Sequence, residues 1–425
     1  MSVIRNVLIW DSGRENAEWG DIVIGDDGAI AEIAPAQTSR GDVLFDGRGH
    51  TLAMPGLVNA HTHASMTLLR GLGEELPLLE WLERKIFPVE ERINPRHIRI
   101  GAELAFLEML SGGTTCFADM YFFMREVASA ALNAGMRCSL SRGITGDDPA
   151  KLNENLTLAE EFDGRDGRVR IQLGPHAPYT VPRTALEKIV QAAKDKGLGV
   201  HFHWLETKGE FESFKSGFGM KPADYLERTG LLGVKELSLA HCVWFPVEEL
   251  EHVKLDNVTL VHNPKSNLKL GSGYAPIKEM LETGVNVALG TDGAASNNRL
   301  DMWDEMRTAA LMHKGYHGNP TLVSAREVLR MATAGGAKGA GFPSAGMITP
   351  SYAADVVLVD LDQPHYVGID PTNAPEFLVY AGSSRDVRAT IIAGKMLYQG
   401  GKHLTLDREE IMAKAKEARK ELTGK

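Results

Sequence analysis

Two histidines separated by one residue, His61 and His63, are the first indication of chemistry in this chain. They follow the short apolar run 56–60, whose start is marked by Pro55 and Gly56, and this pattern predicts a buried strand. Side chains two residues apart on a strand share a face, so both imidazoles would leave the strand side by side. Two neutral imidazoles placed in this way form half of a tetrahedral metal site. The alternative is a pair of surface histidines in a loop, and only the rest of the chain can decide between the two.

Predicted strands alternate with amphipathic helical stretches through the middle of the chain. Such alternation is typical of parallel βαβ units, and eight units predict a TIM barrel, the (β/α)8 fold of the α/β class. We therefore expect a catalytic barrel domain over residues 54–350. The eight predicted strands cover residues 56–61, 115–119, 138–142, 169–174, 199–203, 237–241, 258–262 and 285–290.

The two ends of the chain, residues 1–53 and 351–425, contain further predicted strands separated by turns. Neither end has enough apolar residues for a core of its own, so we expect them to pack together as one small β-sandwich domain. The tail from 408 to 425 is rich in charge and alanine, which predicts a C-terminal helix exposed to solvent.

The composition is that of an ordinary globular protein, with 425 residues of which 43% are hydrophobic and 24% are charged. A net charge of -10 argues against binding to nucleic acid or to an anionic membrane. We find no apolar run of about 18 residues and no secretory signal. The three cysteines are widely spaced, which favours reduced thiols. We therefore expect a cytoplasmic protein with a small-molecule partner, and leave open whether it forms a homo-oligomer.

Histidines and an aspartate fall where the predicted barrel strands end, on the face where TIM barrels carry their reactive groups. The fifth strand ends at His203, and Asp292 follows the eighth. Together with His61 and His63 they offer three nitrogens and one carboxylate oxygen. One divalent ion would bind this set, foremost Zn²⁺, although Fe²⁺, Mn²⁺ or Co²⁺ would accept the same ligands. Such an ion lowers the pKa of a bound water to about 7, which supplies a nucleophile at neutral pH.

Three side chains near these ligands are candidates for moving protons or stabilising charge. Asp292 could take a proton from the attacking water, and Glu206 could give one to a ring nitrogen of the substrate. His241, at the end of the sixth strand, could hold the nucleophile or polarise the substrate. We expect His201 to point out of the barrel and to be structural, and His262 to support a loop.

Several segments together resemble the amidohydrolase superfamily, and the β-rich chain ends match it as well. Members with two metal ions have a carboxylated lysine at the end of the fourth strand, where this chain has His176, so the resemblance implies one metal ion. The longer matches, above all residues 291–298, resemble the 5-methylthioadenosine/S-adenosylhomocysteine deaminases. That resemblance implies hydrolytic loss of ammonia from C6 of an adenine nucleoside. The segments that match the superfamily are 55–63, 203–206, 240–242, 262–264 and 290–293, and those that match the deaminases are 66–71, 119–121, 174–179, 263–271 and 291–298.

The same resemblance implies substrate contacts at five positions. Trp81 would form a wall of the pocket, Glu90 would bind ribose hydroxyls, and His176 would contact base and sugar. Ser296 would contact the purine edge, unless it only caps the following helix. Arg142 would pair with the carboxylate of a homocysteine group.

One position departs from the pattern of enzymes that act on S-adenosylhomocysteine. These tend to have a second arginine after the third strand, whereas this chain has Lys151. A lysine binds a carboxylate as a point charge, without the two-pronged geometry of arginine, so the preferred 5′ substituent stays open.

Two alternatives to adenine nucleoside deamination remain. The same scaffold could attack guanine, cytosine or an s-triazine ring, because fold does not fix substrate. A scaffold without catalysis is the other alternative, but it should have lost a ligand or a proton-transfer group. Since Glu206 and His241 accompany all four candidate ligands, an enzyme is favoured.

Overall fold

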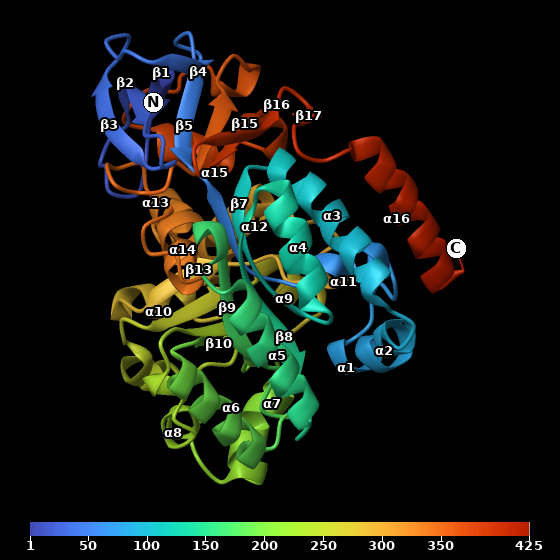
Figure 1. Cartoon of the computed structure of the whole chain (residues 1–425). Helices are drawn as coiled ribbons and strands as arrows, with labels where there is room; N and C mark the ends of the chain where they lie inside the picture. The colour runs from blue at the N-terminus through green and yellow to red at the C-terminus, as the bar shows by residue number, and fades with distance from the viewer. Residues whose placement is uncertain (425) are drawn as a thin grey trace.

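The structure, a computed structural model, describes residues 1–424 and contains two β-sheets (Figure 1). One sheet of eight strands comes from the middle of the chain, and the other, of nine strands, comes from its two ends. No helix within residues 1–424 has the length and the apolar run that crossing a bilayer requires.

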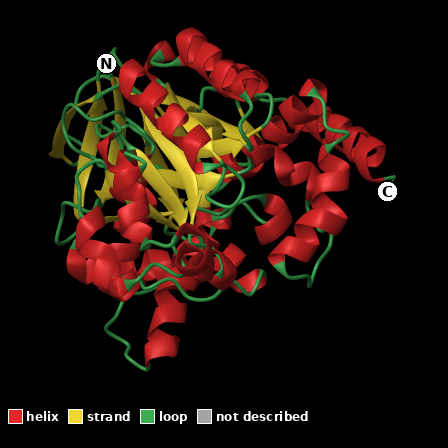
Figure 2. Ribbon diagram, turned by 90° about the horizontal axis from the view of Figure 1, so that it is seen from below, coloured by secondary structure: helices red, strands yellow, loops and turns green. Residues whose placement is uncertain are grey.

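The eight central strands run parallel, and each pairs with its neighbour in sequence, as in a TIM barrel. Helices surround them (Figure 2), so the strands are buried on both faces, and this is why they are continuous apolar runs in the sequence. All eight predicted strands are present. They are β6 (Leu57–Thr62), β7 (Thr114–Tyr121), β8 (Arg137–Ile144), β9 (Val169–Pro175), β10 (Gly199–Trp204), β11 (Leu237–His241), β12 (Val258–His262) and β13 (Asn286–Leu289).

The end of β13 approaches β6 closely, and this contact brings the first and last strands of the barrel together. A Cβ atom on Gly290 would lie 2.7 Å from the backbone nitrogen of His61, so only glycine fits there. The backbone N–H of Asp292 then donates to the carbonyl of His61 at 2.9 Å. Asn59 adds two hydrogen bonds, accepting from the Thr291 N–H at 2.9 Å and donating to its hydroxyl at 2.7 Å. The barrel closure therefore also fixes Asp292 beside His61.

Most helices cover the outside of the barrel, and three short ones between β6 and β7 lie at its mouth. Those three are α1, the π-helix η2 (Leu82–Ile86) and α2, and they carry Trp81 and Glu90. The α-helices are α1 (Leu78–Trp81), α2 (Phe87–Glu90), α3 (Pro95–Ser111), α4 (Met124–Ala134), α5 (Pro149–Phe162), α6 (Arg183–Lys196), α7 (Lys208–Ser213), α8 (Pro222–Arg228), α9 (Pro264–Lys269), α10 (Ile277–Thr283), α11 (Ala294–Asn297), α12 (Met302–His317), α13 (Ala325–Arg330), α14 (Gly336–Gly339), α15 (Ala374–Tyr380) and α16 (Arg408–Thr423).

The chain ends combine into one mixed sheet. Its two halves meet where β5 and β14 pair as antiparallel neighbours, although the whole barrel separates these strands in the sequence. Apolar side chains of both ends share one core, as the sequence analysis expected. The predicted boundary between residues 53 and 54 falls inside β5, and the barrel begins after Pro55. The strands are β1 (Ser2–Ile9), β2 (Glu18–Ile24), β3 (Ile30–Pro35), β4 (Asp42–Asp46), β5 (Thr51–Pro55), β14 (Val356–Asp360), β15 (Val387–Ile392), β16 (Lys395–Gln399) and β17 (Lys402–His403).

The C-terminal helix α16 is present, but the expectation that solvent surrounds it is wrong. Ile411, Ala415, Ala418 and Leu422 are buried, and the helix lies along α3 of the barrel (Figure 1). Their spacing of three or four residues forms one apolar stripe, which the high charge of the other positions obscures in the sequence. The helix therefore joins the end domain to the barrel.

Candidate active site

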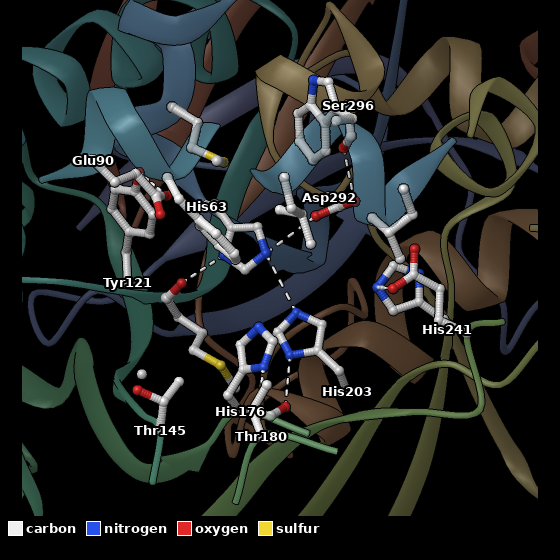
Figure 3. Close-up of a pocket in the computed structure, with 18 of the residues that line it drawn as sticks. His63, Glu90, Tyr121, Thr145, His176, Thr180, His203, His241, Asp292 and Ser296 are labelled. Carbon is white, nitrogen blue, oxygen red and sulfur yellow. Dashed lines mark hydrogen bonds and ion pairs between the residues drawn. The ribbon is translucent and has the colours of Figure 1, made fainter. Parts of the chain in front are cut away.

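The four predicted metal ligands meet at the carboxyl end of the barrel, where His63, His203 and Asp292 point toward one another (Figure 3). Oδ1 of Asp292 lies 3.2 Å from Nε2 of His63 and 3.6 Å from Nε2 of His61. Nε2 of His203 lies 3.4 Å from Nε2 of His63. All four side chains are buried or nearly so. The structure therefore brings the four predicted ligands together at one place.

The protonation of the imidazoles fits a cation at the centre of this group. Nδ1 of His63 lies 2.5 Å from the carbonyl of Met120, and Nδ1 of His203 lies 2.8 Å from that of His176. A carbonyl only accepts, so each Nδ1 holds a proton and each Nε2 points into the site, where a metal ion could bind it. Nε2 of His61 is also buried and makes no hydrogen bond within residues 1–424, although Oδ1 of Asp292 lies 3.6 Å away. Converging lone pairs beside a carboxylate are the donor set of a divalent metal site.

Burial and the charge of Asp292 shift the pKa values of the site residues in different directions. Burial lowers the pKa of His63, but the hydrogen bond and charge of Asp292 outweigh it and raise that pKa to about 9. Burial alone would raise the pKa of Asp292, yet its interactions with the imidazoles of His61 and His63 hold that pKa well below its ordinary value. Burial lowers the pKa of His61 to about 3, which keeps this imidazole neutral and able to bind a metal.

The expectation that His201 points out of the barrel is wrong. Its Nε2 lies 2.8 Å from Nδ1 of His61, and the side chain is fully buried. The physical reason is the two-residue repeat of a strand, which places His201 and His203 on the same, inward face of β10. The contact with His201 thus fixes the orientation of the His61 ring.

A second pair of side chains, Glu206 and His241, lies beside the ligands. Nε2 of His241 is 3.8 Å from Oε2 of Glu206, and both side chains are buried. Nδ1 of His241 donates to Oδ1 of Asn267 at 2.9 Å, which directs Nε2 into the site. The backbone is left-handed at His241 (φ 76°) and at Asp292 (φ 60°). Such conformations cost energy for non-glycine residues and concentrate at functional sites.

The buried carboxylate of Glu210 holds the loop that carries Glu206. It accepts hydrogen bonds from the backbone N–H groups of Leu205 at 2.8 Å and of Glu206 at 3.0 Å. Leu205 has a left-handed backbone (φ 51°), so this turn needs support. Glu210 was not among the residues predicted from the sequence. The spacing of Thr207 and Glu210 predicts only a helix cap, in which the Thr207 hydroxyl accepts from the N–H of Glu210. It does not predict that the Glu210 carboxylate holds the preceding loop.

Two serines hold the other oxygen of Asp292. The hydroxyl of Ser266 donates to Oδ2 at 2.6 Å, and that of Ser296 does so at 2.7 Å. Sequence analysis placed Ser296 at the purine edge, and the structure puts its hydroxyl on the carboxylate while its side chain also lines the pocket. Ser266, like Asn267, lies on α9 and was not singled out, because its role depends on how α9 packs at the strand end.

A cavity of about 880 Å³, part of it open to solvent, leads to these residues (Figure 3). Its walls include Trp81, Glu90, His176 and Ser296, four of the five predicted substrate contacts. Glu90 accepts from the hydroxyl of Tyr121 at 2.6 Å, and burial raises the pKa of Glu90. An apolar wall with a few placed polar groups is typical of a small-molecule site. The remaining apolar lining is formed by Met66, Leu78, Leu82, Phe87, Met120 and Phe122.

The fifth predicted contact, Arg142, does not line this cavity. Its Nε donates to Glu154 at 2.8 Å, and the side chain lines a separate cavity beside α4 and α5. Lys151 is also outside the lining, and its ammonium group donates to the carbonyl and hydroxyl of Thr145 at 3.1 and 2.8 Å.

Comparison with known proteins agrees with this geometry. The model of the amidohydrolase family matches residues 52–397. The chain belongs to this family. Other amidohydrolases are similar over nearly their whole length. A 5-methylthioadenosine/S-adenosylhomocysteine deaminase of Dictyoglomus thermophilum is 45% identical, with 93% of each chain covered. A 5'-deoxyadenosine deaminase of Methanosarcina mazei is 42% identical, covering 100% of this chain and 98% of its own.

A solved amidohydrolase structure is similar in fold as well. The adenosine deaminase from Xanthomonas campestris with bound zinc superposes with a TM-score of 0.93 at 32% identity, covering 100% of this chain and 99% of its own. This amidohydrolase chain is thus an enzyme of the class that hydrolyses C–N bonds, with a site for a divalent metal ion and a small-molecule substrate.

Proposed function

We propose that this amidohydrolase deaminates adenine nucleosides, namely 5′-methylthioadenosine, S-adenosylhomocysteine and adenosine. The observation that carries the proposal is the juxtaposition of a four-ligand metal site with the buried Glu206–His241 pair at the base of an apolar cavity. The names of the similar deaminases support the choice of the adenine ring.

We assign the metal site to His61, His63, His203 and Asp292, with Zn²⁺ as the resident ion. Three imidazole nitrogens and one carboxylate oxygen suit zinc, and the similar adenosine deaminase structure carries zinc. When bound, the ion makes water acidic enough to act as a nucleophile near neutral pH and stabilises the developing negative charge.

Two carboxyl groups of the chain would move the protons. Asp292, whose pKa is held low, accepts the proton that the attacking water releases. Burial raises the pKa of Glu206 above its ordinary value, so this carboxyl group can hold a proton near neutral pH and give it to the ring nitrogen beside C6. The new bond joins the water oxygen to C6. The amino nitrogen then takes up the proton held by Asp292, its bond to C6 breaks and ammonia leaves, while the hydroxyl proton of the intermediate returns to Glu206 as the C6 carbonyl forms.

Three further side chains would hold the reactants in place. His241, fixed by Asn267, faces the attacking oxygen and stabilises it as the bond to C6 forms. Glu90, in the cavity wall, accepts hydrogen bonds from ribose hydroxyls, and His176 contacts the sugar and the base. Trp81 is fixed by the hydrogen bond from its Nε1 to Leu72 at 2.8 Å and offers an apolar wall.

The test is hydrolysis of a panel of substrates by the metal-loaded protein, measured as ammonia release or, for the chlorotriazine, as chloride release. The panel contains adenosine, 5′-methylthioadenosine, guanine, cytosine and a chlorotriazine. We expect release from the adenine nucleosides together with the matching inosine product. No turnover of any adenine nucleoside, with turnover of guanine, cytosine or the triazine, would refute the proposal and favour another ring on the same scaffold.

A further inference from the structure

The segment 291–297 is buried throughout, although the proposed chemistry uses only Asp292 and Ser296 from it. Two of its features are still without a role. Asp292 has a left-handed backbone (φ 60°), and the side chain of Asn297 is buried. A left-handed conformation costs energy for a residue other than glycine and persists only where its surroundings hold it. The contacts around Asp292 should therefore include the groups that hold its backbone.

The peptide bond between Thr291 and Asp292 is hydrogen-bonded at both of its polar groups. Its N–H donates to the carbonyl of His61 at 2.9 Å, and its carbonyl accepts from Nδ2 of Asn297 at 2.6 Å. The rotation of this peptide about the N–Cα bond of Asp292 is the φ angle of that residue. A rotation to the ordinary negative range would turn both groups away from their partners. His61 and Asn297 together therefore fix the backbone from which the Asp292 carboxylate projects.

The amide of Asn297 is itself oriented by a buried carboxyl group on another helix. Its Nδ2 also donates to Oε1 of Glu305 on α12 at 2.6 Å, and Glu305 is fully buried. The amide has one orientation in this place, because its oxygen would face two acceptors if it were turned around. Oε2 of Glu305 accepts from the backbone N–H of Lys265 at 3.2 Å. A carboxyl group keeps an accepting oxygen whether it is ionised or protonated, so the bond to Asn297 exists in both states.

The backbone at Asp292 decides where its two carboxylate oxygens lie. Oδ1 is 3.2 Å from Nε2 of His63, and Oδ2 accepts from the hydroxyl of Ser296 at 2.7 Å (Figure 3). The side chain has only two torsions, so it cannot keep both contacts once its Cα–Cβ bond points elsewhere. Partners that fix the direction of a metal ligand affect metal affinity as well as activity.

We propose that Asn297 is a positioning residue for Asp292. By holding the Thr291 carbonyl, it keeps the left-handed backbone at Asp292 and thus keeps the carboxylate directed at the three histidine ligands. Glu305 acts one step behind, because it orients the Asn297 amide. The inference rests on the proposed function, in which Asp292 both binds the metal ion and accepts a proton.

Asn297→Ala removes the donor to Thr291 and leaves every ligand and every residue of the cavity wall in place. Asn286→Ala is the matched control, since Asn286 lies at the opposite end of β13. Its Nδ2 also donates two hydrogen bonds, to Oγ1 of Thr259 at 2.8 Å and to the carbonyl of Gly335 at 3.0 Å. Both variants lose two hydrogen bonds, so both should have a lower melting temperature.

The deciding quantities are the dissociation constant of Zn²⁺, measured by competition with a chelator, and kcat for 5′-methylthioadenosine at saturating zinc. We expect Asn297→Ala to bind zinc about tenfold or more weakly and to lose about tenfold or more in kcat. Asn286→Ala should match the wild type in both. Wild-type zinc affinity or wild-type kcat in Asn297→Ala would overturn the inference. Equal losses in the two variants would also overturn it, because they would reduce the effect to lost stability.

A second variant covers the case in which Asn297→Ala does not fold. Asn297→Ser has a side chain too short to bridge both acceptors, and the same two quantities decide. Failure of the proposed function has a different signature, namely wild-type protein that binds no zinc or, when loaded, deaminates no adenine nucleoside. If the wild type does both and the Asn297 variant equals it, only this inference fails.

Discussion

Replacing Glu210 by glutamine tests how the catalytic loop is held, because Glu210 touches Glu206 only through the backbone. Its two carboxylate oxygens accept the N–H groups of Leu205 and Glu206 at 2.8 and 3.0 Å in a buried place. Glutamine keeps the shape but has one oxygen and one NH₂ group. One backbone N–H then faces another donor and loses its partner.

The magnitude follows from the lost hydrogen bond. A hydrogen bond to a charged group contributes about 1.5–3 kcal/mol, which corresponds to about 10- to 150-fold in a rate constant. If the bond serves to align Glu206, kcat falls by up to that factor while KM and metal content stay near the wild type. If it serves only folding, the melting temperature falls and kcat of the folded protein is unchanged.

The pH profile sharpens the assay, because burial raises the pKa of Glu210 to about 8. Below this pH the carboxyl group is protonated and, like glutamine, has only one oxygen free of hydrogen. Above it the ionised carboxylate has two accepting oxygens, so the difference in kcat between wild type and Glu210→Gln should grow as the pH rises through about 8. Glu212→Gln, an exposed substitution on the same helix, is the control. Equal kcat values for Glu210→Gln and wild type across this range would refute the positioning role.

Three further perturbations test separate parts of the account. His203→Ala should lower both the bound metal, measured by elemental analysis, and the turnover, because one of four ligands is lost; full metal occupancy in this variant would contradict its assignment. Glu206→Gln should keep the metal and lose about 100-fold or more in kcat, and a metal-loaded variant with normal turnover would exclude the proton transfer. Burial raises the pKa of Glu305 to about 8, so the folded state binds its proton more tightly than the unfolded chain and loses stability as the pH rises toward about 8. Glu305→Gln should flatten this decline in melting temperature, and a parallel decline would contradict the buried titration.

The barrel and the positions of the four candidate ligands could be predicted because local sequence determines them. A parallel strand covered on both faces is a short apolar run, and the residue at its end lies on the catalytic face. His61, His63, His203 and Asp292 all follow from that rule. The sheet of the chain ends was predicted less completely, since β3, β4 and β5 have weaker patterns and obtain their pairing from the rest of the sheet.

Side-chain direction explains where sequence reasoning went wrong. His201 shares a face with His203 because they are two residues apart, so the outward orientation expected for it is excluded by the geometry of the strand. Arg142 also lies at a strand end, and its parity puts it on the opposite face from Thr145, so its contact with a substrate stays a prediction. The position of a residue at a strand end is therefore not sufficient to predict that its side chain faces the cavity. The prediction also needs the alternation of side chains along the strand.

Residues that hold the catalytic groups in place could not be predicted, since their partners are set by packing. Asn267 meets His241 only because α9 packs at the end of β11 and β12, and Ser266 meets Asp292 for the same reason. Glu210 has the sequence context of a helix cap, and its carboxylate in addition accepts a hydrogen bond from the backbone of the preceding turn.

The most direct measurement of the central claim is ammonia release from 5′-methylthioadenosine by protein first freed of metal by a chelator and then reloaded with Zn²⁺. We expect no release from the metal-free protein, and recovery of release together with the inosine analogue once about one zinc ion is bound per chain. Release that continues in protein shown to contain no metal would contradict the account, as would the lack of any release from the fully loaded protein.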